Sequence, residues 1–462
     1  MSKVLRPKLL VVGGGPGGYV AAIRAGQLGV ETVLVEVGRL GGTCLTRGCI
    51  PSKALIHAAG LYEEMARASS EAGHLGIRLD APPRIDVAAT MAWKDGVIER
   101  LSGGVAGLLR RARVTVVQGW ARFADAKTCT VETPEGPVKI EPEHVVLATG
   151  SVPVELPSLP FGGHVLSSTE ALALTALPKS LAVVGAGYIG LELGIAFAKL
   201  GVRVALVEAA ERILPQYDAA LTRPVADWLH AHDVELHLNA RAQGKAARGL
   251  AIETERTDRF TIPAEAMLVT VGRMPNTEGW GLETMGIEMD GRFIRVDERC
   301  ATSTRNVWAI GDVTGEPMLA HRASAQGVVV AEIIAGQRRR FDPVAIPAIC
   351  FTEPEIVSVG LARADERHAV GQVPFAANGR ALSMDAGDTG GFVRTIAEKA
   401  SGRIVGIQAV GRHISELAGE FAALVEMGAT LEDVAGIIHA HPTLGEMVHE
   451  SALKALGHAI HV

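Results

Sequence analysis

Residues 9–18, LLVVGGGPGG, place three glycines directly after an apolar run. Gly13, Gly15 and Gly18 have the GxGxxG spacing of a dinucleotide-binding turn between a strand and a helix. A helix-like run follows, and the next strand-like run, ETVLVE, ends on Glu36. In such a turn the glycines permit close backbone packing around a pyrophosphate, and the acid binds a ribose hydroxyl. The stretch therefore predicts a parallel α/β domain that binds a dinucleotide.

The same pattern occurs a second time. Residues 181–190, LAVVGAGYIG, repeat the spacing with Gly185, Gly187 and Gly190, and the next strand-like run ends on Glu208. In both copies the acid lies 23 positions after the first glycine. One glycine motif is weak evidence in a chain with 53 glycines. Two copies, each with a strand before it and a helix after it, predict two dinucleotide sites.

The acid of the second copy bears on which nucleotide binds there. A carboxylate at Glu208 would repel the 2′-phosphate of NADP and would accept a hydrogen bond from the ribose of NAD. Arg212, four residues later, could serve a 2′-phosphate instead and keeps NADP open. The sequence favours NAD.

Length and composition limit the class of protein. A chain of 462 residues is too long for one core and predicts about two to four domains. It is 48% hydrophobic and 21% charged, which excludes disorder. The net charge of −6 comes without a basic stripe, so nucleic acid is not an expected partner. No apolar stretch reaches the roughly 20 residues of a membrane span, and the N-terminus lacks a signal-peptide cleavage site. We expect a soluble cytoplasmic protein.

A cysteine pair lies shortly after the first fingerprint. Residues 41–53, GGTCLTRGCIPSK, contain Cys44 and Cys49, five positions apart. Five residues of regular helix span about 7.5 Å, more than the ~7 Å between Cα atoms that a disulfide accepts. The two cysteines can therefore bridge only where the backbone departs from a regular helix. Gly48 and Pro51 permit such a departure.

The pair has three possible uses. A metal clip lacks a second pair of ligands, because the nearest histidine, His57, stands alone. A static cross-link would close a small loop and would be reduced in the cytoplasm. A redox-active dithiol is favoured, because the nucleotide fingerprint ending at Glu36 lies eight residues upstream. The remaining cysteines stand singly in apolar contexts and are expected to be ordinary buried thiols: Cys129, Cys300 and Cys350.

Several motifs, taken in order, resemble one family. The segments are GGGPGG, GGTCLTRGCIPSK, GAGYIGLELG, AIGDV and HPTLGE. Together they resemble the flavin-dependent pyridine nucleotide–disulfide oxidoreductases, from about residue 9 to the C-terminus. Within that family the chain looks most like the members that oxidise dihydrolipoamide. The resemblance implies an α/β fold with two Rossmann-like dinucleotide-binding domains and an α+β C-terminal dimerisation domain.

The resemblance also implies an order of domains. An FAD-binding domain with the redox disulfide would occupy residues 1–150, and an NAD-binding domain residues 151–272. A central domain that returns to FAD would occupy residues 273–345, and the dimerisation domain residues 346–462.

The family's cofactor-binding residues carry over to matching positions. FAD would contact the first fingerprint and further residues along its length, namely Gly13, Gly15, Gly18, Glu36, Gly42, Thr43, Lys53, Ala121, Asp312 and Ala320. NAD would contact the second fingerprint through Gly185, Gly187, Gly190 and Glu208. Gly272, further along the chain, completes the set of cofactor-binding residues. Glu192 resembles the carboxylate that pairs with Lys53 beside the flavin. Taken alone, Glu192 would be expected on a solvated helix face.

A base for thiol chemistry is expected near the C-terminus. His441 lies five residues before Glu446 in HAHPTLGEMVHE. The thiolate is the reactive form of a cysteine or a dithiol, and a histidine held by a carboxylate suits the proton transfer. The resemblance implies that His441 reaches the disulfide of the other subunit of a homodimer, and that Cys49 faces the flavin. The other late histidines are expected to be ordinary residues: His439, His449, His458 and His461.

Three positions depart from the family pattern. Gly445 stands where many members have serine, between the histidine and its carboxylate. Thr46 and Arg47 replace the usual asparagine–valine type pair, and Arg47 adds a positive charge between the cysteines.

The resemblance implies an activity. Protein-bound dihydrolipoamide would be oxidised through Cys44, Cys49 and FAD, and NAD⁺ would be reduced. The partner would be the lipoyl-bearing acyltransferase of a 2-oxo acid dehydrogenase complex, and the C-terminal motifs look closest to branched-chain forms. A glutathione-type reductase would want arginines where Glu208 stands. A mercuric-type reductase would want cysteines beyond Cys350, and a non-catalytic complex subunit is the remaining alternative.

Overall fold

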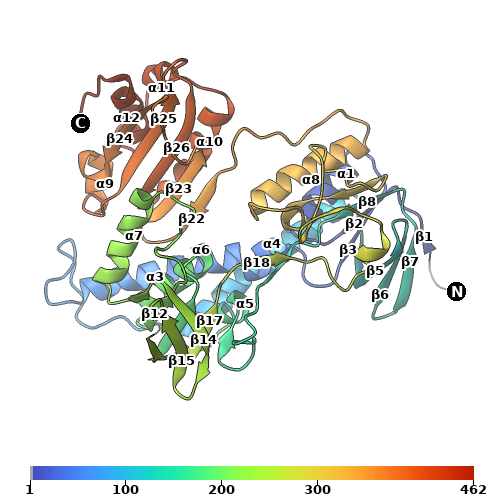
Figure 1. Ribbon diagram of the computed structural model, residues 1–462, viewed down its shortest axis with the longest axis horizontal. Helices are drawn as coiled ribbons and strands as arrows, with labels where there is room; N and C mark the ends of the chain where they lie inside the picture. The colour runs from blue at the N-terminus through green and yellow to red at the C-terminus, as the bar shows by residue number, and fades with distance from the viewer. Residues whose placement is uncertain (1–3, 257, 462) are drawn as a thin grey trace.

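The computed structural model describes residues 4–256 and 258–461. Three large sheets organise this part of the chain (Figure 1). Two are parallel and five-stranded, and the third is antiparallel and lies at the far end of the molecule from the N-terminal sheet. The predicted fold class, two Rossmann-like domains and an α+β C-terminal domain, is confirmed. No helix in the described ranges is long and apolar enough to cross a membrane.

The first parallel sheet has the strand order β21-β8-β2-β3-β4. Its strands are β2 (Leu9–Val12), β3 (Thr32–Glu36), β4 (Thr115–Gln118), β8 (His144–Leu147) and β21 (Val307–Ala309). The residues of β2 are buried throughout, as a parallel strand covered on both faces requires. Helix α1 (Pro16–Gln27) packs against α8 (Ala320–Ile334) beside this sheet (Figure 1). Strand β21 thus returns to the first sheet from more than 150 residues later in the chain.

Further elements surround the first sheet. A four-stranded sheet has the order β1-β7-β6-β5, from β1 (Val4–Leu5), β5 (Trp120–Asp125), β6 (Thr128–Thr133) and β7 (Gly136–Ile140). The connection between β3 and β4 forms helices α2 (Gly42–Arg47), α3 (Cys49–Ala68) and α4 (Val87–Arg111).

The second parallel sheet has the order β10-β17-β11-β12-β13. Its strands are β10 (Val165–Leu166), β11 (Ser180–Val184), β12 (Arg203–Val207), β13 (Glu235–His237) and β17 (Ala266–Val269). The helices of this region are α5 (Ser168–Ala171), α6 (Tyr188–Lys199) and α7 (Ala219–Ala231). An antiparallel sheet adjoins it, formed by β14 (Ala240–Ala246), β15 (Gly249–Thr254) and β16 (Arg259–Pro263).

Two extended segments link the parallel sheets. Strand β9 (Ser151–Pro153) leaves the first sheet and pairs antiparallel with β18 (Arg273–Pro275), which leaves the second. After β18 come short elements: η1 (Leu282–Thr284), β19 (Met289–Asp290), β20 (Phe293–Ile294) and η2 (Gly311–Thr314).

The C-terminal sheet is antiparallel, in the order β22-β23-β26-β25-β24. Its strands are β22 (Ala348–Cys350), β23 (Glu355–Gly360), β24 (His368–Pro374), β25 (Phe392–Glu398) and β26 (Ile404–Gly411). The accompanying helices are η3 (Phe375–Ala377), α9 (Gly379–Ser383), η4 (Ile414–Leu417), α10 (Ala418–Glu426), α11 (Leu431–Gly436) and α12 (Glu446–Leu456).

Helix α3 connects the regions through one core. Leu55 and Ala59 of α3 belong to the same hydrophobic cluster as Leu193 of α6 and Cys350 of β22. Ile50 of α3 also packs against the cluster that contains Leu9 and Leu34 of the first sheet, so all three sheets fix this helix.

Candidate active site

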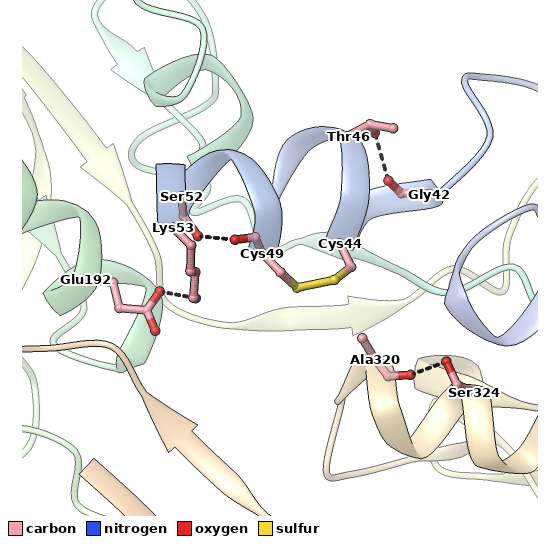
Figure 2. The surroundings of a disulfide bond; sticks show 9 residues. All are labelled: Gly42, Cys44, Thr46, Cys49, Ser52, Lys53, Glu192, Ala320 and Ser324. Carbon is pink, nitrogen blue, oxygen red and sulfur yellow. Dashed lines mark hydrogen bonds and ion pairs between the residues drawn. A yellow bond between two sulfur atoms is a disulfide. The ribbon is translucent and has the colours of Figure 1, made fainter. Parts of the chain in front are cut away.

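The two cysteines of the pair are bridged. Cys44 and Cys49 form a disulfide with their Cα atoms 4.6 Å apart (Figure 2). The helix is interrupted between them, because α2 ends at Arg47 and Gly48 has φ −143° and ψ −107° before α3 begins. A Cβ at Gly48 would lie 2.9 Å from the carbonyl oxygen of Thr43. The predicted departure from a regular helix is confirmed, and a glycine provides it.

The first glycine loop forms a backbone cradle between β2 and α1. A side chain at Gly13, whose φ is +102°, or at Gly18 would collide with neighbouring carbonyl groups. At Gly15 a Cβ would have only Gly42 nearby, with its Cα 3.9 Å away. Gly15 also precedes Pro16 at the N-terminus of α1, and no side chain caps this helix end. Two glycines therefore serve packing, and Gly15 leaves room for an anion at free N–H groups.

An acid closes each glycine loop. Glu36 accepts hydrogen bonds from the N–H groups of Gly14, at 2.6 Å, and Gly38, at 2.7 Å. The same arrangement recurs in the second domain, where Glu208 accepts from Ala186 at 2.7 Å and from Ala210 at 2.8 Å. Each carboxylate is thereby fixed at the mouth of its loop.

Arg212, the residue that could have served the 2′-phosphate of NADP, binds backbone carbonyl groups. Its guanidinium donates a hydrogen bond of 2.7 Å to the carbonyl oxygen of Tyr217 and a second bond to that of Pro215. These bonds direct the Arg212 guanidinium to carbonyl groups of its own loop.

A cavity of about 290 Å³ runs from the first glycine loop to the disulfide. Many of the predicted residues line it, namely Gly13, Gly15, Glu36, Gly42, Thr43, Cys44, Cys49, Lys53, Ala121, Glu192, Asp312 and Ala320. The cavity fits FAD. The helix end suits the pyrophosphate of FAD, and the redox-capable disulfide at the other end suits its ring system.

Other predicted residues lie outside the wall of this cavity. Gly18 packs behind the loop, and Gly185, Gly187 and Gly190 form the second loop, between β11 and α6. Gly272 precedes β18, and its carbonyl oxygen accepts a hydrogen bond from Val154.

Lys53 and Glu192 form an ion pair at the disulfide end of the cavity. Lys53 Nζ lies 2.7 Å from Glu192 Oε2, and Figure 2 shows Lys53 pointing toward it from α3. The other carboxylate oxygen of Glu192 accepts the N–H of Phe351 at 3.0 Å, and the ring centroid of Phe351 lies 4.4 Å from Lys53 Nζ. The Glu192 side chain is only 4% exposed, so the solvated helix face expected for it alone is wrong. Phe351 directly follows β22, and no motif in the sequence predicted that it would contact Lys53 and Glu192.

Asp312 belongs to a polar chain that joins the linking strands to the cavity. Ser151 Oγ donates to Asp312 Oδ2 at 2.5 Å, and Arg273 Nε donates to Ser151 Oγ at 2.8 Å. All three side chains line the cavity. Sequence reasoning missed Ser151 and Arg273, which become neighbours only because β9 pairs with β18.

His441 and Glu446 are paired on the C-terminal domain. His441 Nδ1 lies 3.0 Å from Glu446 Oε1, and Glu446 Oε2 accepts the N–H of Thr443 at 2.8 Å. Burial alone would raise the pKa of Glu446, but the hydrogen bonds from Thr443 and His441 outweigh it and lower the pKa. The His441 side chain is 79% exposed and does not line the cavity of its own chain. The His441 ring is therefore presented on the surface, while Glu446 holds it through Nδ1.

Other histidines and cysteines have ordinary surroundings. His439 bonds Glu420 at 3.1 Å, and His461 bonds Glu450 at 2.6 Å. Burial is the main cause that raises the pKa of each remaining thiol to about 12, which confirms the expected inert thiols, Cys129, Cys300 and Cys350. Within residues 4–256 and 258–461 no cluster of three or more His, Cys, Asp or Glu side chains could hold a metal ion.

Comparison with known proteins agrees with this geometry. The family model for pyridine nucleotide-disulphide oxidoreductases matches residues 7–327, and the model for their dimerisation domain matches residues 346–452. The chain is 57% identical to a dihydrolipoyl dehydrogenase of Pseudomonas aeruginosa over 100% of both chains. It is 45% identical to that of Geobacillus stearothermophilus, over 99% of this chain and 98% of the relative.

Solved structures have the same fold. LpdA from Mycobacterium tuberculosis superposes with a TM-score of 0.88 at 27% identity, covering 97% of this chain and 99% of that one. The HOCl-induced flavoprotein disulfide reductase RclA from Escherichia coli gives a TM-score of 0.84 at 26% identity, covering 96% and 99%. The chain belongs to the pyridine nucleotide-disulphide oxidoreductase family.

Proposed function

We propose that this chain oxidises protein-bound dihydrolipoamide to lipoamide and reduces NAD⁺ to NADH, with FAD as its bound cofactor. The observation that carries the proposal is the single cavity that joins the Gly13–Gly18 cradle to the Cys44–Cys49 disulfide. The full-length similarity to dihydrolipoyl dehydrogenases supports the choice of substrate.

The residues that line the cavity would hold FAD. The Gly15 end of α1 would bind the pyrophosphate of FAD, and Glu36 would bind its ribose. Asp312 would bind the polar segment of FAD that joins the pyrophosphate to the flavin ring. The chemistry that FAD supplies when bound is two-electron transfer between a dithiol and NAD⁺. The second loop, with Gly187 and Glu208, would bind NAD⁺.

The chain's own residues account for the thiol–disulfide exchange. A substrate thiolate attacks Cys44 Sγ, the bond to Cys49 breaks, and Cys49 leaves as a thiolate. The second substrate thiol, deprotonated, attacks the substrate sulfur of the mixed disulfide and releases Cys44 with a closed lipoyl ring. Substrate loses two electrons and two protons, and the protein disulfide gains the two electrons. His441 takes a thiol proton at Nε2 while Glu446 holds Nδ1.

The helix geometry supports Cys49 as the leaving thiolate. Cys49 is the first residue of α3, where free N–H groups and the helix dipole favour a negative charge such as a thiolate. Lys53 follows one turn later on the same helix and adds a positive charge. Cys44 lies in α2, which has only six residues against twenty in α3 and therefore a smaller helix dipole.

The exposed position of His441 supports a homodimer in which each histidine serves the other subunit's disulfide. We propose a lipoyl-bearing acyltransferase of a 2-oxo acid dehydrogenase complex as the partner. A branched-chain complex is the proposed context, and the cytoplasm the proposed location.

The test is turnover by the purified flavoprotein with dihydrolipoamide, compared with NAD⁺ and with NADP⁺ as acceptor. We expect rapid reduction of NAD⁺ and much slower reduction of NADP⁺. Absence of turnover with both acceptors would overturn the proposed substrate, and a preference for NADP⁺ would overturn the role of Glu208.

A further inference from the structure

Lys199, the last residue of α6, is a buried cation between two carboxylates. Its side chain is 6% exposed. Lys199 Nζ lies 2.9 Å from Glu63 Oε2 of α3 and 2.7 Å from Glu353 Oε2, in the segment that follows β22. The three residues come from three separate regions of the chain, so this contact joins those regions.

The Lys199 cluster repeats the Lys53 cluster with the charges reversed. The same three segments supply both sets of contacts: Lys53, Glu192 and Phe351 in the first, and Glu63, Lys199 and Glu353 in the second. In the first set α3 carries the cation and α6 the anion, and in the second set the order is exchanged. Glu63 lies ten residues beyond Lys53 on α3, and Lys199 lies seven beyond Glu192 on α6. Two ion pairs, Lys53–Glu192 and Glu63–Lys199, therefore join α3 to α6.

Neighbouring groups keep the second cluster charged. Glu63 Oε1 lies 3.2 Å from His232 Nε2, and the His232 ring stacks on Trp228 with centroids 3.9 Å apart. Burial lowers the pKa of Lys199, but Glu353 and Glu63 outweigh it and the pKa is raised. Burial raises the pKa of Glu63, but His232 and Lys199 outweigh it and the pKa is lowered. Lys199 and Glu63 are therefore both ionised at neutral pH.

A second cavity, of about 1110 Å³, runs along both clusters. Lys53, Phe351, Lys199 and Glu353 all line it, and Lys53 also lines the cavity of the disulfide. This cavity borders α3 on the side that carries both clusters, so the ion pairs contribute to the placement of the helix there.

We propose that Lys199, Glu63 and Glu353 form a clasp that positions α3 on α6 and so holds Lys53 against Glu192. The clasp residues are positioning residues, and the proposal rests on the proposed function through the role of Lys53 beside Cys49. Replacing Lys199 leaves the carboxylates of Glu63 and Glu353 without the cation between them, and we expect α3 to shift in response. A displacement of about 1 Å at a reacting group can lower a rate by about 100-fold.

A double-mutant cycle tests the clasp in the FAD-loaded protein. Lys199→Met is expected to lower kcat for NAD⁺ reduction by about 10-fold or more. In a Glu192→Gln background, where Lys53 has already lost its partner, the same change should cost less than about 2-fold. Lys199→Arg, which keeps the charge, should restore most of kcat. Equal losses in both backgrounds would overturn the proposal, because the clasp would then act independently of Lys53.

A second readout does not depend on the substrate. After chemical reduction of the disulfide, the pH dependence of iodoacetamide alkylation, followed at the Cys49 peptide by mass spectrometry, reports the pKa of Cys49. Lys199→Met should shift this profile to higher pH, and Lys53→Met should shift it in the same direction. If wild-type protein failed to oxidise dihydrolipoamide but the shift appeared, the proposed function would fall and the clasp would stand.

A matched cluster elsewhere provides the control. Glu332 of α8 lies between two cations, 2.7 Å from Arg24 and 2.8 Å from Arg339, and its side chain is also buried. Glu332→Gln should lower the melting temperature but leave kcat within about 2-fold and show no coupling to Glu192→Gln. An equal loss of kcat in this control would attribute the effect of Lys199→Met to general destabilisation. Should Lys199→Met not fold, Glu353→Gln, which leaves the Lys199–Glu63 pair, enters the same cycle.

Discussion

Gly187 and Gly190 lie three residues apart in the second glycine loop, yet a Cβ would collide with protein only at Gly190. There it would meet Thr270 Oγ1 at 2.6 Å and overlap the carbonyl oxygen of Gly185. A Cβ at Gly187 would have no atom of the described residues within 4 Å apart from its chain neighbours and its own helix backbone, and the φ of −75° suits any residue. The two glycines therefore separate packing from ligand approach.

Alanine at the two positions should affect different properties: stability at Gly190 and NAD⁺ binding at Gly187. Gly190→Ala should destabilise the protein by about 1–3 kcal/mol, the usual cost of overpacking, measured as a lower melting temperature. Gly187→Ala should keep the melting temperature and the FAD content but raise KM for NAD⁺ by about 10-fold, because its methyl group occupies space needed by the pyrophosphate. Normal NAD⁺ binding by Gly187→Ala would mean that the nucleotide does not approach this loop.

The choice of nucleotide should depend on Glu208. Glu208→Ala is expected to raise KM for NAD⁺ by about 10-fold or more, since a hydrogen bond to a charged group contributes about 1.5–3 kcal/mol. The preference over NADP⁺ should narrow at the same time. Glu211→Ala, at an exposed acid three residues further on, is the matched control and should change neither value. An unchanged preference in Glu208→Ala would assign nucleotide selection to other residues.

Complementation between subunits tests the placement of His441. His441→Gln homodimers should lose about 10²- to 10⁴-fold in kcat, the usual contribution of a general base, and Cys49→Ser homodimers should be inactive. A mixed dimer of the two variants keeps one disulfide and one histidine on different chains. It should regain activity at one site if His441 serves the other subunit. Activity absent from the mixed dimer would place the histidine and the disulfide of one site on the same chain. His458→Gln, at an exposed histidine, should remain active.

Stability should depend on pH through His232. The hydrogen bond to Glu63 is the main cause that raises the pKa of His232, against the opposing effect of burial. The protonated form is thus favoured in the folded protein. Its contribution is complete below the unfolded pKa of about 6.5 and is lost as pH rises through the folded pKa. The difference in melting temperature between wild type and His232→Gln should be larger at pH 5.5 than at pH 9. His57→Gln, at an exposed histidine on α3, the helix that carries Glu63, should show no such trend.

Local features of the site could be predicted from the sequence. The two glycine loops depend on residues within about 25 positions of each other, and each loop closes on its own acid, Glu36 or Glu208. Helix rise and disulfide reach predicted that Cys44 and Cys49 could bridge only across a break in the helix. In both cases the geometry depends on short-range backbone constraints that the sequence contains.

Features that depend on distant segments could not be predicted in this way. Glu192 is buried because Lys53 and Phe351, from two other regions, satisfy its carboxylate. Ser151 and Arg273 meet only through the pairing of β9 with β18. No spacing rule connects such positions, and the assignment of Glu192 came from the family resemblance.

The most direct test of the redox-active disulfide is the mapping of alkylated cysteines by mass spectrometry. The purified flavoprotein is treated anaerobically with one equivalent of dihydrolipoamide, with or without a subsequent excess of NAD⁺, and then with iodoacetamide. Cys44 and Cys49 should be alkylated only after dihydrolipoamide, and NAD⁺ should restore their protection, while Cys129, Cys300 and Cys350 stay unmodified throughout. Unchanged protection of Cys44 and Cys49 in the presence of dihydrolipoamide would contradict the account.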